Sequence, residues 1–189
     1  MKVGLVIVAI VVVLVIAVIA SYNRFVRQRN LVQESWRQVD VELKRRYDLI
    51  PNLIETVKGY AAHESGVLQA VTAARTAAEQ AGTVAQQATA ETTLGRSLGG
   101  LFAVAENYPT LKADSSFLAL QSQLGETEDR IAAARRFYNA NVRDYNIARS
   151  SFPTMLVAGF GDFPPQDFFE VEDSSIRNAP QVSFSPGQT

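Results

Sequence analysis

Residues 22–60 read YNRFVRQRNLVQESWRQVDVELKRRYDLIPNLIETVKGY. Apolar side chains recur in this stretch every seven residues, or two helical turns, and predict one long helix with an apolar seam. Only Arg29 and Arg46 interrupt the seam, and because it keeps its register across Pro51, we expect that proline to kink the helix without ending it. The seam has two interleaved sets: Phe25, Val32, Val39, Leu53 and Tyr60, and Tyr22, Trp36, Leu43, Ile50 and Val57.

An apolar run lies directly before this stretch. Residues 3–20 read VGLVIVAIVVVLVIAVIA and predict a membrane-spanning helix of about 27 Å, since they contain no polar side chain. A cleaved signal peptide is the alternative, because Val18 and Ala20 are small enough for cleavage after Ala20. The run is longer than the apolar core of a signal peptide, and only Met1 and Lys2 precede it. We therefore expect an uncleaved anchor over residues 1–22, and a single span excludes a multi-span transporter or channel.

Three arginines follow the span. Arg24, Arg27 and Arg29 lie just after it, whereas Lys2 and the terminal amine precede it. Because positive charge flanking a span favours the cytoplasmic side, we expect the N-terminus outside and the rest of the chain in the cytoplasm. The same arginines are candidates for contact with lipid headgroups at the membrane interface, or they form the solvated start of the next helix.

A second long helix is expected between residues 111 and 152, where apolar residues recur in register until Pro153 ends them. Shorter helices are expected over residues 64–81 and about 86–107. The fold class is thus all-α: a single N-terminal transmembrane helix that continues into an elongated antiparallel bundle with two long and two shorter helices, over residues 23–152. In this bundle Trp36 should lie near Tyr138.

One charged residue of the seam needs a partner. An unpaired buried charge costs several kcal/mol, so Arg46 should form an ion pair. Antiparallel alignment of the two long helices places Glu126 or Glu128 opposite Arg46, and we expect one of these carboxylates to bind it.

The segment after the second long helix is rich in aromatic residues. Residues 153–170 include Phe160, Phe163, Phe168 and Phe169, which are candidates for an interaction surface. The segment should pack on the membrane-proximal part of the bundle, or contact the membrane or a neighbouring subunit. Residues 171–189 are polar and acidic, and we expect this tail to be disordered.

The composition offers little chemistry. The chain has no cysteine and one histidine, and its 18 basic and 19 acidic residues balance. We therefore expect no catalytic residue, no metal site, no cofactor and no nucleic-acid partner.

Three stretches resemble the signature blocks of the LemA family of bacterial membrane proteins. They read VELKRRYDLIPNLIETVKGYAAHE (41–64), LFAVAENYPTLKADSSFLALQSQL (101–124) and ETEDRIAAARRFYNANVRDYN (126–146). The resemblance implies a single anchor in the bacterial inner membrane with the N-terminus outside, a cytoplasmic helical bundle and no established enzymatic activity. It also links the chain with proteins associated with internal membranes and with envelope-stress proteases.

From these observations we expect a non-enzymatic scaffold that contacts membrane lipids, forms homo-oligomers and takes part in membrane organisation or remodelling. The alternative is an adaptor that presents its bundle to another membrane protein, such as an envelope-stress protease.

Overall fold

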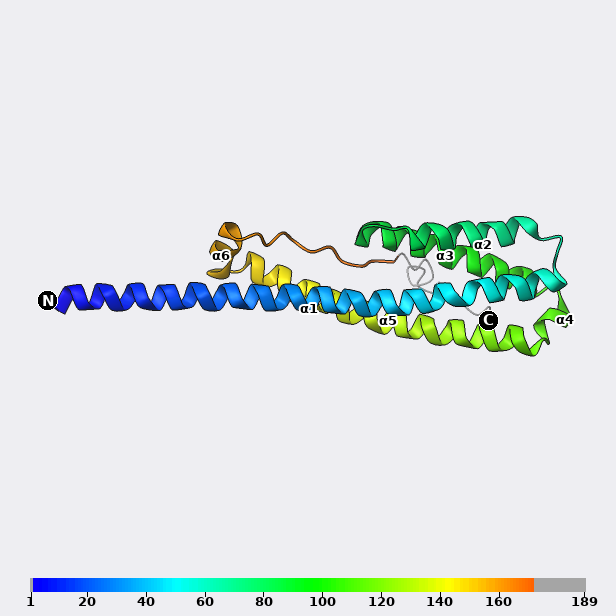
Figure 1. Ribbon diagram of the computed structural model, residues 1–189, viewed down its shortest axis with the longest axis horizontal. Coiled ribbons are helices and arrows are strands. Elements are labelled where there is room, and N and C mark those ends of the chain that lie inside the picture. Colours follow the sequence, from blue (N-terminus) through cyan, green and yellow to red (C-terminus); the bar gives the residue numbers. More distant parts are fainter. Residues whose placement is uncertain (1, 172–189) are drawn as a thin grey trace, which may run out of the picture.

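The computed structural model describes residues 2–171, which form an elongated bundle of helices without strands (Figure 1). The predicted all-α fold class is confirmed. Most of the expected acidic tail, residues 172–189, lies outside the described residues, so its predicted disorder stays a prediction.

Helix α1, Lys2–Tyr60, joins the apolar run and the seam in one element of 59 residues. The helix continues through Pro51, whose ring is exposed and so leaves the seam uninterrupted. Most of the apolar seam residues are buried, but Trp36 is only partly buried, and Tyr22 and Tyr60, at the two ends of the seam, are exposed. A window of 18 residues in α1 has a mean hydropathy of 3.6 and is uncovered by the rest of the chain, so α1 is long and apolar enough to cross a membrane.

A helical hairpin covers the distal part of α1. It consists of α2, Ser65–Glu79, and α3, Val84–Ala105, which pack on each other, and α2 also packs on α1 (Figure 1). Thr83 starts α3, since its hydroxyl accepts a hydrogen bond from the backbone N–H of Gln86. Both helices lie within two residues of their predicted bounds.

The second long helix begins later than predicted. The structure has a short helix α4, Pro109–Lys112, and then α5, Ser115–Ser150, in place of one helix from residue 111. Asp114 separates them, because its carboxylate accepts hydrogen bonds from the backbone N–H groups of Ser116 and Phe117 and so caps α5. Leu111 is nevertheless buried in the core, which is why its spacing resembled that of α5.

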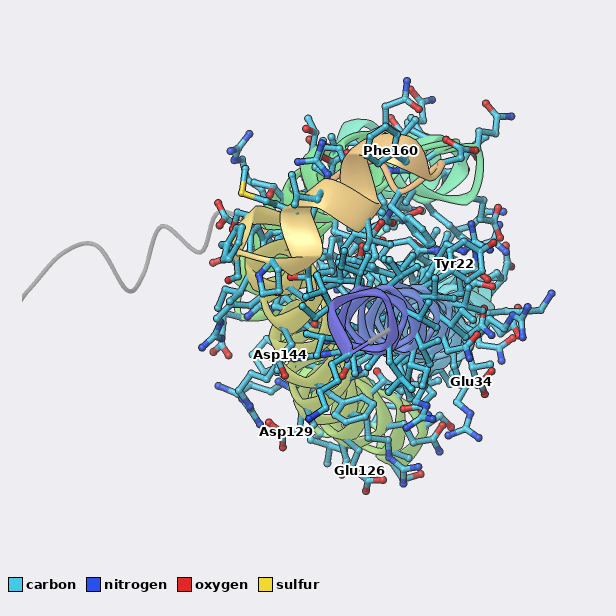
Figure 2. The ribbon with its side chains drawn as sticks, turned by 90° about the vertical axis from the view of Figure 1, so that its left-hand side faces the viewer. Tyr22, Glu34, Glu126, Asp129, Asp144 and Phe160 are labelled. Carbon is cyan, nitrogen blue, oxygen red and sulfur yellow. The ribbon has the colours of Figure 1, made fainter. Side chains whose placement is uncertain are left out.

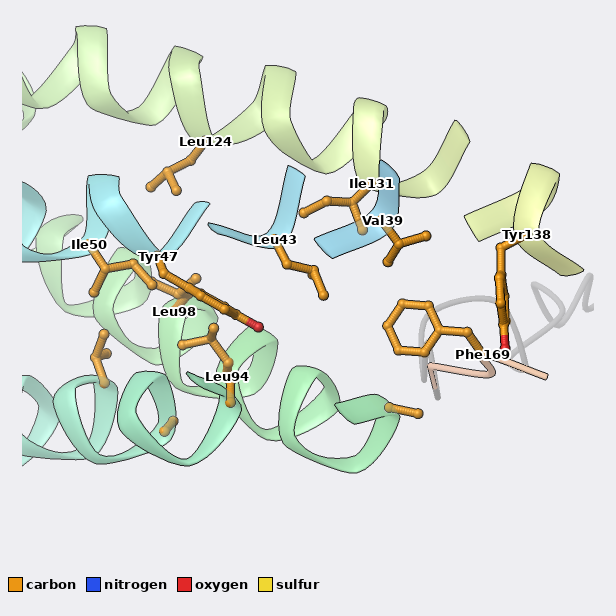
Figure 3. Close-up of a cluster of buried hydrophobic side chains, with 14 of the residues drawn as sticks. Val39, Leu43, Tyr47, Ile50, Leu94, Leu98, Leu124, Ile131, Tyr138 and Phe169 are labelled. Atoms are coloured by element: carbon orange, nitrogen blue, oxygen red, sulfur yellow. The ribbon is translucent and has the colours of Figure 1, made fainter. Parts of the chain in front are cut away.

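Helix α5 runs back along α1 toward the end that carries the apolar run (Figure 1). The rings of Trp36 and Tyr138 lie 5.2 Å apart between centroids, which confirms the predicted antiparallel register. Buried side chains of both helices form the core together with Leu94 and Leu98 of α3 (Figure 3).

The chain after α5 forms a further helix and an extended segment. Helix α6, Thr154–Phe160, was not predicted, and it packs on both α1 and α5. Residues 162–171, here called the strap, then run back along the bundle in extended form toward the turn between α2 and α3 (Figure 1). The strap and α6 cover the proximal part of the bundle, which the α2–α3 hairpin does not reach.

Candidate functional site

A buried ion pair joins three helices in the middle of the bundle. Arg46 of α1 is only 7% exposed. Its Nη1 atom lies 3.0 Å from Oε2 of Glu128 in α5 and 3.2 Å from Oε2 of Glu91 in α3. Of the two carboxylates expected from the sequence, Glu128 contacts Arg46, whereas Glu126 is exposed on the outer face of α5 (Figure 2).

Glu91 is held by two further side chains. Its Oε1 atom accepts a hydrogen bond from the hydroxyl of Tyr47 and another, at 3.0 Å, from the amide of Gln87. The same amide donates to the Tyr47 hydroxyl oxygen at 2.7 Å. We call Arg46, Tyr47, Gln87, Glu91 and Glu128 the polar cluster; its buried members satisfy one another, and the exposed Glu128 closes it on the solvent side.

Burial controls the protonation of this polar cluster. Burial raises the pKa of the Glu91 carboxyl, while the hydrogen bond from Tyr47 and the charge of Arg46 act in the opposite direction. Burial, followed by the hydrogen bond to the Glu91 carboxylate, raises the pKa of Tyr47 well above its usual value. Tyr47 thus remains a proton donor at neutral pH, and the cluster ties helices together.

Sequence reasoning missed Glu91, Gln87 and Tyr47. The first two lie in the Ala-, Gln- and Thr-rich stretch of residues 70–93, which gave no obvious packing pattern. A signal was present, since residues 87, 91, 94, 98 and 101 lie three or four apart and share the buried face of α3.

An open groove adjoins the polar cluster between α3 and α5. Its volume is about 580 Å³, and Arg96 and Arg135 bring positive charge to its lining. Gly95, Gly99 and Gly125 also line it, so the helix backbones are accessible there. We call it the distal groove. Within residues 2–171, no group of three or more His, Cys, Asp or Glu residues is placed to hold a metal ion.

Five side chains of α5 bind the backbone of the strap. Asn139 pairs with both the N–H and the C=O of Phe169, at 2.9 and 3.1 Å, and Asn146 does the same with Gln166, at 3.0 and 2.9 Å. The remaining three donors each bind a strap carbonyl at 2.8–2.9 Å: Tyr138 that of Asp167, Tyr145 that of Pro164 and Arg149 that of Phe163. Burial, then the charge of Asp167, raises the pKa of Tyr138 to about 12, so its hydroxyl stays a donor.

The aromatic rings of the strap fill the space between α1 and α5. The Phe163 ring lies 5.0 Å from that of Phe25, and the Phe169 ring lies 5.4 Å from that of Trp36. Both phenylalanines are buried, in line with packing of this segment on the bundle, so neither ring is open to a partner in this structure. Of the four candidates, Phe160 and Phe168 expose their rings.

The three arginines expected at the membrane interface lie in different environments. Arg24 and Arg27 are exposed on α1. Arg29 is half-buried, and its guanidinium carbon lies 5.7 Å from the centre of the Phe163 ring, a cation–π contact. Arg29 therefore helps to hold the strap, and a lipid role for Arg24 and Arg27 stays a prediction.

A second groove lies between α1 and α5 and is called the lateral groove here. Its volume is about 670 Å³. Val41 and Phe137 line it and are 51% and 50% exposed. Its charged and polar lining residues are Glu34, Arg37, Gln38, Glu42 and Arg130. The lateral groove thus combines an apolar floor with a rim of both charge signs.

Comparison with known proteins gives one family and a small set of relatives. A model of the LemA family matches residues 35–184. Two magnetosome proteins of Paramagnetospirillum magneticum, MamQ 1 and MamQ 2, are each 27% identical to the chain over 186 residues, covering 85% of this chain and 68% of theirs. Magnetosome protein MamQ of Magnetospirillum gryphiswaldense is 25% identical over 174 residues, covering 78% of this chain and 64% of that protein.

Proposed function

This chain belongs to the LemA family, and on that premise we propose that it is a non-enzymatic, membrane-anchored helical scaffold. Its copies associate side by side at the bacterial inner membrane, with the bundle in the cytoplasm, and contribute to the organisation or remodelling of that membrane. The names of the MamQ relatives, which are magnetosome proteins, agree with a role at a membrane. The polar cluster supports the non-enzymatic part, because its groups pair with one another.

The observation that carries self-association is the lateral groove. Val41 and Phe137 leave about half of their surface open on the two longest helices, parallel to the axis of the rod. Covering large apolar side chains provides the main driving force for protein association. A second copy of the chain is the occupant that we propose.

The charges around the lateral groove fit a second copy. Because α1 gives every copy the same orientation in the membrane, a twofold axis between two copies must run along the membrane normal, and residues of equal height meet. Within one copy Glu34 and Arg37 lie 3.3 Å apart and neutralise each other. Because the lateral groove lies between α1 and α5, the twofold axis places Arg130 of α5 opposite the α1 rim of the other copy, which contains Glu42. The rim is thus complementary to itself.

Crosslinking tests this arrangement directly, because the natural chain has no cysteine. Ala133 is small, exposed and lines the lateral groove, so Ala133→Cys places one thiol near the proposed twofold axis. We expect a bifunctional maleimide to join Ala133→Cys chains into dimers in native membranes. Adding Phe137→Glu removes the large apolar ring from the groove. If the second copy covers this ring fully, the free energy of association should become less favourable by about 1.5–3 kcal/mol. The dimer fraction should then fall about tenfold or more.

The matched control is Ala77→Cys, an exposed alanine on α2, far from the lateral groove. This variant should give few dimers at the same expression level. Equal crosslinking of the two cysteine variants, or dimers of Ala133→Cys that persist with Phe137→Glu, would show that the lateral groove does not join copies.

The distal groove favours a second function, an adaptor for another membrane protein. Arg96 and Arg135 suit an acidic segment, and the three glycines allow its backbone to approach closely. The discriminating measurement is crosslinking from Gly99→Cys, a position where an added Cβ meets nothing within 4 Å. An adaptor gives one heterologous product from this position and no dimers from Ala133→Cys, whereas a scaffold gives the reverse.

A further inference from the structure

Helix α6 lies at the level where the apolar run of α1 ends. The Phe163 ring, at the start of the strap, lies 5.5 Å from the ring of Tyr22 and 5.0 Å from that of Phe25. Tyr22 is separated from the apolar run by Ser21 alone. The contacts with α1 therefore place α6 beside the end of the apolar run (Figure 1).

Four large apolar side chains in and before α6 are exposed. Phe160 is 96% and Phe152 is 78% exposed, and Met155 and Leu156 expose about half of their surface. The opposite side of α6 packs on the bundle, because Ala158 is buried and Val157 contacts the core. Soluble proteins seldom leave such a concentration of large apolar side chains open to water.

Helix α6 is open toward the end of the rod that carries the apolar run. Figure 2 looks along α1 from its N-terminal end, and α6 lies in front of the rest of the bundle with Phe160 uncovered. Within the described residues, only α1 extends beyond α6 toward the N-terminal end of the rod (Figure 1).

The charges around α6 suit a lipid surface. Residues 151–160 contain no charged side chain, so their burial in lipid carries no charge-desolvation cost. Arg24 and Arg27 are exposed on α1 within two turns of the apolar run, where phosphate groups of lipids would lie. Asp162 is the acid next to α6 in sequence, and Arg149, bound to the Phe163 carbonyl at 2.9 Å, brings an opposing charge to the same end.

We propose that Phe152, Met155, Leu156 and Phe160 insert into the interfacial region of the leaflet from which α1 emerges. The bundle then stands on the bilayer at two points, α1 and α6, and its tilt is set by both. This contact needs α1 to span the membrane but does not depend on association between copies. Its failure would therefore leave crosslinking through the lateral groove unchanged.

Quenching by lipids tests the insertion. Gly159 is exposed, and an added Cβ meets nothing within 4 Å, so Gly159→Cys accepts an environment-sensitive fluorophore without disturbing α6. The labelled full-length protein is placed, one copy per disc, in nanodiscs of phosphatidylcholine and phosphatidylglycerol that carry spin-labelled acyl chains. We expect blue-shifted emission, strong quenching by the lipids and weak quenching by aqueous iodide. The same label on Ala77→Cys, in α2, should show the opposite pattern.

A second variant separates insertion from chance proximity. Phe160→Asp in the Gly159→Cys background should abolish most of the lipid quenching, and because Phe160 has almost no protein contact, the fold is retained. Leu118→Asp, an exposed leucine at the distal end of α5, should leave the quenching unchanged. A label that iodide quenches fully overturns the proposal. So does a label that neither quencher reaches, which would place protein over α6.

Discussion

Arg46 is the residue on which three helices depend. It occupies a seam position of α1 that would otherwise be apolar, and it contacts both Glu91 and Glu128. Glu91 is buried, so this half of the interaction is shielded from solvent, whereas the side chain of Glu128 is mostly exposed and contributes less. A buried pair seldom adds net stability over an apolar pair, but breaking it by removing one partner is costly.

Arg46→Met tests this dependence. The substitution leaves Glu91 buried with only Tyr47 and Gln87 as donors, and we expect it to lower the free energy of unfolding by about 3–5 kcal/mol at pH 7. Without Arg46 the folded-state pKa of Glu91 rises further above its unfolded value. The deficit is therefore largest at neutral pH and shrinks as the pH falls through the raised folded-state pKa of Glu91, below which this carboxyl is protonated in the folded form of both proteins. Urea unfolding of the full chain in detergent, monitored by circular dichroism, measures this loss in the free energy of unfolding at each pH.

Arg45→Met is the matched control, since the adjacent Arg45 is exposed and pairs with Glu42 of the preceding turn at 3.1 Å. Its effect should stay within about 0.5 kcal/mol at every pH. A deficit of Arg46→Met that is equally large at low pH would contradict the role given to ionised Glu91.

At the scale of elements, the strap is held by a repeated pair of residues on α5. Tyr138–Asn139 and Tyr145–Asn146 are seven residues apart, so both pairs face the same side of the helix. Each asparagine satisfies one N–H and one C=O of the strap, as a neighbouring strand would. The strap thus obtains the backbone hydrogen bonds of a sheet edge from the side chains of a helix.

Two adjacent phenylalanines of the strap should respond differently to truncation. Phe169 is 0% exposed and contacts Trp36, whereas Phe168 is 40% exposed. We expect Phe169→Ala to cost about 3–5 kcal/mol, because it opens a cavity in the proximal core. Phe168→Ala should cost less than about 1 kcal/mol. Trp36 is the single tryptophan of the chain, so its emission reports on the site: it should shift to the red in Phe169→Ala only. Equal shifts in both variants would mean that the strap does not pack on Trp36.

The sequence predicted those elements whose apolar spacing is uninterrupted. The seven-residue repeat was sufficient for α1, and the contact of Trp36 with Tyr138 confirms the register of α1 against α5. The predicted start of α5 was wrong, because Leu111 keeps the apolar spacing across the turn before this helix. Asp114 caps α5 through hydrogen bonds to the backbone, and apolar spacing carries no information about such a cap.

Polar contacts were harder to predict than apolar ones. The pairing of Glu91 with Arg46 depends on how the α2–α3 hairpin packs on α1, which the Ala-rich stretch leaves undefined. The burial of Phe163 and Phe169 depends on Asn and Tyr side chains that bind backbone. A hydropathy pattern treats such Asn and Tyr side chains as polar surface. The sequence therefore left three environments open for this segment: the bundle, the membrane or a neighbouring subunit.

At the scale of the whole molecule, α1 joins the apolar run to the bundle. Its 59 residues form one helix of about 88 Å, and its apolar run enters the seam without a linker. Any tilt of the apolar run is therefore transmitted to the bundle, and α6 packs on α1 next to the end of that run.

The distribution of charge around the span should set the orientation of this rod. Arg24 and Arg27 follow the apolar run and are exposed, while Lys2 precedes it in this chain. Positive charge is retained on the cytoplasmic side, so the bundle should lie in the cytoplasm. Ala77→Cys, an exposed position on α2, reports the side reached. In intact spheroplasts a membrane-impermeant maleimide should leave it unlabelled, and permeabilisation should make labelling complete.

Removing the charges should weaken this preference. With Arg24→Gln and Arg27→Gln, Arg29 alone remains near the end of the span, balanced by Lys2 before it. Because the bias is then lost, we expect a mixed population in which part of the Ala77→Cys chains react in intact spheroplasts. The control is Arg37→Gln, an exposed arginine of α1 further from the span, which should keep the thiol protected. If the Ala77→Cys chain that keeps all its arginines were labelled before permeabilisation, the bundle would lie outside the cytoplasm. Helix α6 would then meet the outer leaflet.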